Sequence, residues 1–184
     1  MSENPYAPPQ AVVEDMPAGQ DGRTPLFFPV STVKFMVLGV CTLSLYQYYW
    51  FYKNWKLVQA RQKEAISPLG RTIFAIFYCY PLLKLIREAG DQPAAATLQA
   101  GALAAVWIVM TLLWRLPDPY WLVTYLSVLA LLPVQVAVNA INKAAAPEHD
   151  PNSRFSGWNW FVVVFGGLTL LLAVYGTLYP QKAG

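Results

Sequence analysis

Residues 158–179 read WNWFVVVFGGLTLLLAVYGTLY, a stretch without a single charged side chain. A helix of about 20 apolar residues is long enough to cross a hydrocarbon core of about 30 Å. Trp158, Trp160 and Tyr179 stand at the two ends of the stretch, and such rings favour the headgroup level of a bilayer. The stretch is therefore predicted to be a membrane-spanning helix.

The rest of the chain has the same character. The whole chain has 184 residues, of which 56% are hydrophobic and only 12% charged, whereas a soluble domain carries about 25% charged residues. Three further apolar stretches lie at about 30–51, 98–114 and 120–138. The turn Arg115-Leu116-Pro117-Asp118-Pro119 predicts that the last two form an antiparallel hairpin. We therefore predict an all-α fold, an integral membrane helical bundle with four transmembrane helices.

Residues 67–87 and 1–29 do not fit the spanning pattern. Arg71 and Lys84 bound an apolar segment that is too short to cross a bilayer, and Pro81 would kink it. We predict one interfacial or re-entrant helix over about 67–87, with a true span as the alternative. Residues 1–29 are acidic and proline-rich, so they are predicted to be a disordered tail. Residues 30–184 then form a single transmembrane domain.

Basic residues predict the orientation. With four spans, nine of them share one face: Lys53, Lys56, Arg61, Lys63, Arg71, Lys84, Arg87, Lys143 and Arg154. The other face holds Arg23, Lys34, Arg115 and Lys182. Lys and Arg accumulate on the cytoplasmic side of membrane proteins, so the nine are predicted to be cytoplasmic and both termini periplasmic.

Catalytic groups are scarce in the predicted spans. All ten acidic residues lie outside them, which argues against proton-coupled transport and against a membrane metalloprotease. The single histidine, His149, lies in a polar loop between Glu148 and Asp150. Cys41 and Cys79 lie in apolar segments, where cysteine behaves as a small hydrophobe. The sequence therefore predicts no catalytic residue, no metal site and no cofactor, and it contains no exposed basic face for nucleic acid.

A few uncharged polar residues fall within or near the spans: Gln47, Thr111, Thr124, Ser127 and Gln135. Such groups usually form hydrogen bonds between helices of a bundle. The alternative is a polar pathway for a small solute.

An aromatic and basic element follows the first stretch. Residues 45–56 read LYQYYWFYKNWK, and Ser67-Pro68 and Arg71 come shortly after. The element resembles a signature of uncharacterised bacterial inner-membrane proteins that carry a "YWFYKNWK" sequence. The resemblance implies a multi-pass protein of the bacterial inner (cytoplasmic) membrane. It implies no assigned activity and supplies no catalytic residue.

These observations favour a non-enzymatic membrane protein whose aromatic and basic cytoplasmic face contacts anionic membrane lipids or a partner membrane protein. The residues predicted to form this face are Tyr49, Trp50, Lys53, Trp55, Lys56 and Arg71. Plain anchoring without recognition is one alternative, and a small channel or transporter subunit acting as a homo-oligomer is another. An enzyme acting on lipids is disfavoured, because the chain has one histidine and no acid within its spans.

Overall fold

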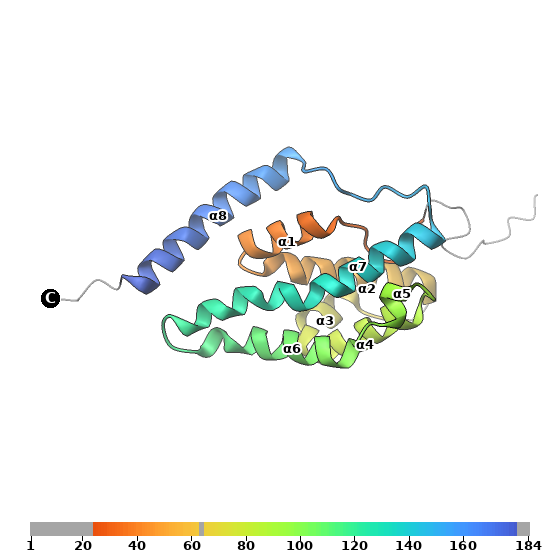
Figure 1. The fold of residues 1–184 in the computed structure, drawn as a ribbon, viewed down its shortest axis with the longest axis horizontal. Coiled ribbons are helices and arrows are strands. Elements are labelled where there is room, and N and C mark those ends of the chain that lie inside the picture. The colour runs from red at the N-terminus through yellow and green to blue at the C-terminus, as the bar shows by residue number, and fades with distance from the viewer. Residues whose placement is uncertain (1–23, 63–64, 180–184) are drawn as a thin grey trace, which may run out of the picture.

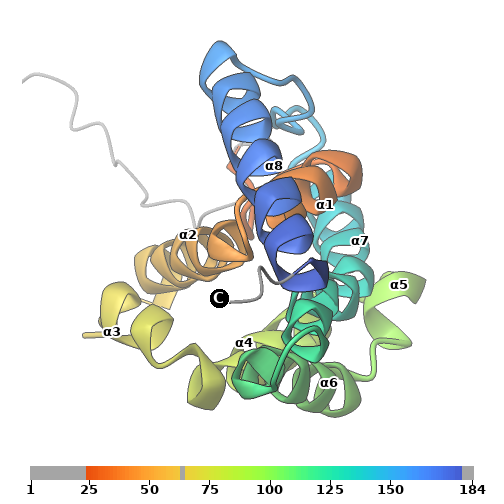
Figure 2. The same cartoon turned by 90° about the vertical axis from the view of Figure 1, so that its left-hand side faces the viewer.

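A computed structural model describes residues 24–62 and 65–179, and these residues form helices joined by turns and short loops, with no strand among them (Figures 1 and 2). The predicted all-α fold is confirmed. The helices are α1 (Thr32–Cys41), α2 (Leu45–Gln62), α3 (Pro68–Ile73), α4 (Ala75–Glu88), α5 (Pro93–Ala96), α6 (Ala100–Leu112), η1 (Leu113–Arg115), η2 (Tyr120–Leu126), α7 (Ser127–Ala145) and α8 (Gly157–Leu178).

The helix predicted over 30–51 is interrupted, because the chain turns back between α1 and α2 (Figure 1). Leu43 and Ser44 take positive φ angles of 53° and 71°. The Ser44 amide donates to the Gly39 carbonyl at 3.0 Å, and the Leu43 amide donates to the Val40 carbonyl at 3.1 Å. These two bonds form a Schellman cap, which ends α1 after ten residues. Residues 30–51 therefore do not form one straight spanning helix.

The segment predicted to be helical over 67–87 forms α3 and α4, which meet at Phe74. Ser67 caps α3 by accepting a hydrogen bond from the Gly70 amide at 3.1 Å. One face of α4 is buried against the core through Cys79, Leu82 and Ile86. The opposite face exposes Phe77 and Tyr80, so α4 is a half-buried helix of the bundle.

The hairpin predicted around the two-proline turn is present. The helix α6 and the short η1 run to this turn, and η2 and α7 return beside them (Figure 1). The helix α7 is central, because it contacts α1, α4, α5 and α6. Its buried face includes Val128, Leu131, Val134, Val138 and Ile141.

The last helix, α8, lies on the outside of the bundle next to α1 (Figure 1). It packs against α1, and none of its residues is buried. The contact depends on Gly166, since a Cβ atom there would lie 2.0 Å from the carbonyl oxygen of Cys41. Only a glycine lets the two backbones approach this closely.

Two helical segments among the described residues are long and apolar enough to cross a membrane: Tyr120–Ala145, which joins η2 to α7, and Gly157–Leu178, which is α8. Ala100–Arg115 is apolar but shorter. The predicted count of four spans is therefore not confirmed. Large apolar side chains nevertheless cover the outside of α8, among them Phe161, Val164, Leu168, Leu171 and Leu172. An exposed apolar surface of this kind is typical of contact with lipid or protein.

Candidate functional site

The helix α2 carries most of the residues predicted to contact lipid or a partner, and it divides them between two faces. Tyr49 and Lys56 are exposed, and Lys53 is half-buried. Trp50 and Trp55 are completely buried, each with an exposed fraction of 0%. These two indoles belong to the core and offer no surface to a partner, which corrects their predicted role.

Trp50 belongs to a buried hydrogen-bond network between helices. Its indole nitrogen donates to Gln135 Oε1 at 2.6 Å. The Nε2 of Gln135 donates to the Val30 carbonyl at 2.9 Å and to Asn139 Oδ1 at 2.8 Å. The network therefore joins α2, α7 and the segment that precedes α1. Gln47 shows the same behaviour: it accepts from Trp107 Nε1 at 2.6 Å and donates to Ser127 Oγ at 3.0 Å.

These hydrogen bonds distinguish the two interpretations of the polar residues, which are hydrogen bonding between helices and a polar pathway for a small solute. Both Nε2 groups donate within the protein, and both Oε1 atoms accept a bond from an indole. Gln47 and Gln135 are almost fully buried, with exposed fractions of 1% and 0%. The packing interpretation is confirmed for these two residues and for Ser127, and neither glutamine has an amide aimed at an open path.

Residues 24–29 were predicted to belong to a disordered tail, but part of this segment is held in the core. The Phe27 backbone forms two hydrogen bonds with Asn142, its amide donating at 3.0 Å and its carbonyl accepting at 2.8 Å. The Phe28 amide donates to Asn54 Oδ1 at 3.0 Å. Side-chain amides of α2 and α7 thus satisfy backbone groups of a segment that is neither helix nor strand. The rest of the predicted tail, residues 1–23, lies outside the described residues.

Arg71 also contacts the protein itself. Its guanidinium carbon lies 4.4 Å from the centre of the Trp55 ring and 5.3 Å from that of Tyr78. Such cation–π contacts contribute about 0.5–2 kcal/mol. Arg71 therefore joins α3 to α2 and α4 at the outer edge of the bundle.

The most distinctive surface feature is a cavity of about 750 Å³ between α1, α2 and the start of α8. Three cationic residues line it, Lys34, Lys53 and Arg154, and no acidic side chain is among the described residues that do so. The Lys53 ammonium lies 5.5 Å from the centre of the Phe28 ring. We call these residues and their neighbours the basic cavity; the full lining is Phe28, Lys34, Leu38, Thr42, Leu45, Tyr46, Tyr49, Lys53, Asn152, Arg154, Ser156, Trp158, Asn159 and Val162.

Lys34 lies at the back of the basic cavity, with only 5% of its surface exposed. Its ammonium donates to Asn152 Oδ1 at 2.7 Å and to the Arg154 carbonyl at 2.8 Å. With the Asn159 amide in the orientation that satisfies its neighbours, the Asn159 oxygen accepts a third bond at 3.0 Å. The carboxylate of Asp150, in the loop before α8, supplies a nearby negative charge.

The contact between Lys34 and Arg154 disagrees with the predicted orientation. Four straight spans would place Lys34 and Arg154 on opposite faces of the membrane, whereas the structure places them in direct hydrogen-bond contact. The feature that the sequence analysis did not predict is the interruption of the first apolar stretch after Cys41. Because α1 ends at Cys41, its first residues and the loop before α8 can lie at the same level.

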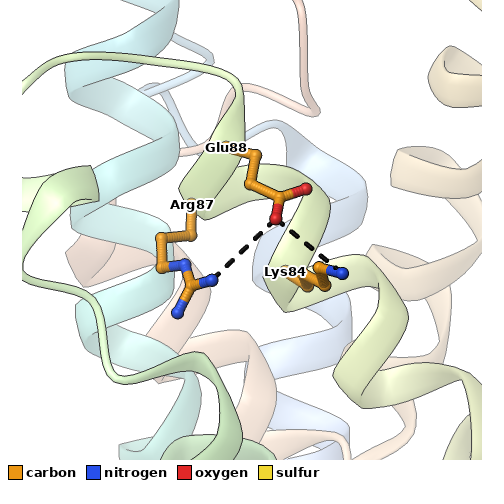
Figure 3. A network of polar contacts seen from close by, with 3 residues as sticks. All are labelled: Lys84, Arg87 and Glu88. Atoms are coloured by element: carbon orange, nitrogen blue, oxygen red, sulfur yellow. Dashed lines mark ion pairs between the residues drawn. The ribbon is translucent and has the colours of Figure 1, made fainter.

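A second group of charges lies at the end of α4. Glu88 lies 3.9 Å from both Lys84 Nζ and Arg87 Nη2, on the exposed surface (Figure 3). Exposed pairs of this kind contribute about 0–1 kcal/mol. The acid offsets part of the positive charge there, so the basic cavity is the better candidate for anion binding.

The remaining candidate groups form no reactive cluster. His149 Nδ1 contacts the Ala146 carbonyl in the loop after α7. Cys79 is buried, Cys41 is partly buried, and both thiols are free. No group of three or more His, Cys, Asp or Glu residues that could hold a metal ion occurs among the described residues. No family model, curated protein or solved structure matches this chain.

Proposed function

We propose that this chain is a non-enzymatic, multi-pass protein of the bacterial cytoplasmic membrane, and that its aromatic and basic side contacts anionic lipid headgroups. The supporting observation is the separation of charge from apolar surface. Arg61, Arg87 and Lys143 lie in the last turns of α2, α4 and α7. The surface of α8 is almost wholly apolar.

The same separation suggests a topology. The C-terminal ends of α2 and α7 lie at one end of the long axis, and the turn between α6 and α7 lies at the other with the C-terminal end of α8 (Figure 1). The basic end is assigned to the cytoplasm. The segments α6–η1, η2–α7 and α8 then cross the membrane, and α1 with the start of α2 forms a re-entrant hairpin.

The length of α1 supports this assignment over four crossings. Its ten residues rise about 15 Å, half the thickness of the hydrocarbon core. A re-entrant hairpin returns the chain to the side from which it came. It also lets Lys34 and Arg154 lie at one level, as their hydrogen bond requires. The N-terminus is then cytoplasmic and the C-terminus periplasmic.

Topology is tested with reporter fusions placed before Thr24, between Asp118 and Pro119, at Asp150 and after Tyr179. The first and third junctions are expected to be cytoplasmic, and the second and fourth periplasmic. A periplasmic first junction together with a cytoplasmic third one would instead support the four-span arrangement with both termini outside.

Lipid contact is tested by native mass spectrometry of protein released from mixed vesicles of phosphatidylglycerol and phosphatidylcholine. The retained lipid is expected to be enriched in phosphatidylglycerol, and the enrichment should fall with added salt, because exposed charges are screened. Retention in the proportions of the vesicle would contradict a specific contact with anionic lipid. Turnover of the lipids during incubation would contradict the non-enzymatic assignment.

A further inference from the structure

The basic cavity has the size and the two-part chemistry of a ligand site. Its volume of about 750 Å³ lies within the range of about 300–1,000 Å³ typical of small-molecule pockets. Cationic side chains form one part of its wall. Leu38, Leu45 and Val162 form an apolar part, where α1 and α2 face α8.

The cationic part contains three cations, and the nearby carboxylate of Asp150 compensates their positive charge only in part. The hydrogen bonds of the Lys34 ammonium all go to neutral oxygens, of the Asn152 and Asn159 amides and the Arg154 carbonyl. A buried charge whose hydrogen-bond partners are all neutral is costly, and a bound anion would add to the partial compensation that Asp150 gives. Lys34 thus supplies a fixed positive charge, while its donors are already used.

Two other cations are free of such constraints. Arg154 is exposed, and its guanidinium can present two parallel N–H groups to a phosphate. Lys53 contacts the Phe28 ring with its ammonium, which leaves donors for an anion. Together with Lys34, they provide one fixed and two adjustable positive charges.

The apolar part points to the rest of the ligand. From the cations, the cavity extends past Leu38 and Val162, between helices whose outer surfaces are themselves apolar. Trp158 and Tyr49 also line the cavity and are exposed. A small anion would leave the apolar wall empty, whereas an acyl chain would cover it and gain about 25 cal/mol for each Å² of apolar surface removed from water.

We propose that the basic cavity binds one anionic amphiphile, with an acidic phosphate headgroup between Lys53 and Arg154 and an acyl chain along Leu38 and Val162. The proposal rests on the proposed membrane function. In addition to a general contact with anionic lipid, it specifies a defined site that binds one ligand molecule. The ligand class is a phospholipid or lysophospholipid of net negative charge.

The test uses the full chain in neutral phosphatidylcholine nanodiscs, titrated with lysophosphatidylglycerol and followed by native mass spectrometry. The site variant carries Lys53→Gln and Arg154→Gln, and the matched control carries Lys84→Gln and Arg115→Gln, which remove the same charge from exposed positions outside the basic cavity. We expect one bound lysophosphatidylglycerol. The site variant should bind it at least about tenfold more weakly, because each lost bond involves a charged group, and the control should change less than about threefold.

Three further measurements separate the sources of binding. Glycerol 3-phosphate, which has the headgroup chemistry without a chain, should bind far more weakly than lysophosphatidylglycerol. Lysophosphatidylcholine, which has the chain without a net charge, should also bind weakly. Val162→Trp, which fills the apolar part and keeps every charge, should lower the affinity, with circular dichroism verifying the helical content.

The outcomes distinguish this inference from the proposed function. The protein could preferentially retain phosphatidylglycerol from mixed vesicles while the site and control variants lose equal affinity for lysophosphatidylglycerol. This result would overturn the cavity proposal and leave the surface contact standing. Equal binding of glycerol 3-phosphate would replace the amphiphile with a free phosphate. If the unmodified protein shows no preference for anionic lipid, both proposals are overturned.

Discussion

The ammonium of Lys34 donates a hydrogen bond of 2.8 Å to the carbonyl oxygen of Arg154, a residue 120 positions further along the chain. Together with Asn152, this contact fixes the loop before α8 to the start of α1. Further along α8, Gly166 lies against the carbonyl of Cys41 at the other end of α1. The position of α8 therefore depends on contacts at both ends of α1.

Replacing Lys34 should release the loop before α8. Lys34→Met removes the ammonium, so the Asn152 and Asn159 oxygens lose their shared donor, at an expected cost of about 2 kcal/mol. The local readout is tryptic cleavage after Arg154, which should become faster. Lys84→Met is the control, because that residue lies on the exposed surface of α4 in a weak ion pair. Unchanged cleavage in Lys34→Met would contradict the contact.

Replacing Leu43 should distinguish the hairpin from a straight helix. Leu43 has a φ of 53°, a left-handed conformation that costs a residue with a Cβ atom about 1–2 kcal/mol. Leu43→Gly is therefore expected to stabilise the protein by about 1 kcal/mol in thermal unfolding. If residues 30–51 formed one continuous helix, the same change would destabilise it by about 1 kcal/mol. Leu45→Gly, at the first position of α2, should destabilise the protein in either case.

The features that could be predicted are those that long windows of sequence determine. The uncharged stretch that forms α8 and the two-proline turn between α6 and α7 need no knowledge of distant contacts. Hydrophobic length and proline chemistry act locally, so these elements follow from the sequence.

The reversal after α1 could not be predicted in this way. Left-handed positions are usually occupied by glycine or asparagine, but here they hold Leu43 and Ser44, which carry no turn signal. The missed reversal also explains why the prediction separated Lys34 from Arg154, two residues that the structure places in hydrogen-bond contact.

The inward orientation of Trp50 had a weak signal. Gln47, Trp50, Asn54 and Val58 recur three and four residues apart, which is the spacing of one helical face. Since aromatic residues occur on every face of α2, this spacing did not stand out. The basic cavity had no signal at all, because its residues come from three separate parts of the chain.

Removing the indole donor of Trp50 should lower the stability of the protein. Trp50→Phe leaves Gln135 Oε1 without its donor and creates a void, so we expect a loss of about 2–4 kcal/mol. Tyr49→Phe, on the exposed face of the same helix, should change stability by less than about 0.5 kcal/mol. Denaturant titration in detergent micelles measures the free energy of unfolding of both variants. A larger loss for Tyr49→Phe would contradict the assignment of the two faces.

A pair of glycines in α8 tests its contact with α1. Gly166→Ala places a methyl group 2.0 Å from the Cys41 carbonyl oxygen, so the helix must move away from α1. Gly176 lies in the same helix with open space around its Cα, so Gly176→Ala should stabilise α8 by up to about 1 kcal/mol. Gly166→Ala should therefore speed cleavage after Arg154 and lower the thermal stability. Gly176→Ala should slow this cleavage and raise the thermal stability. If Gly166→Ala were as stable as Gly176→Ala, α8 would not pack on α1 as described, and the basic cavity between them would lose one wall.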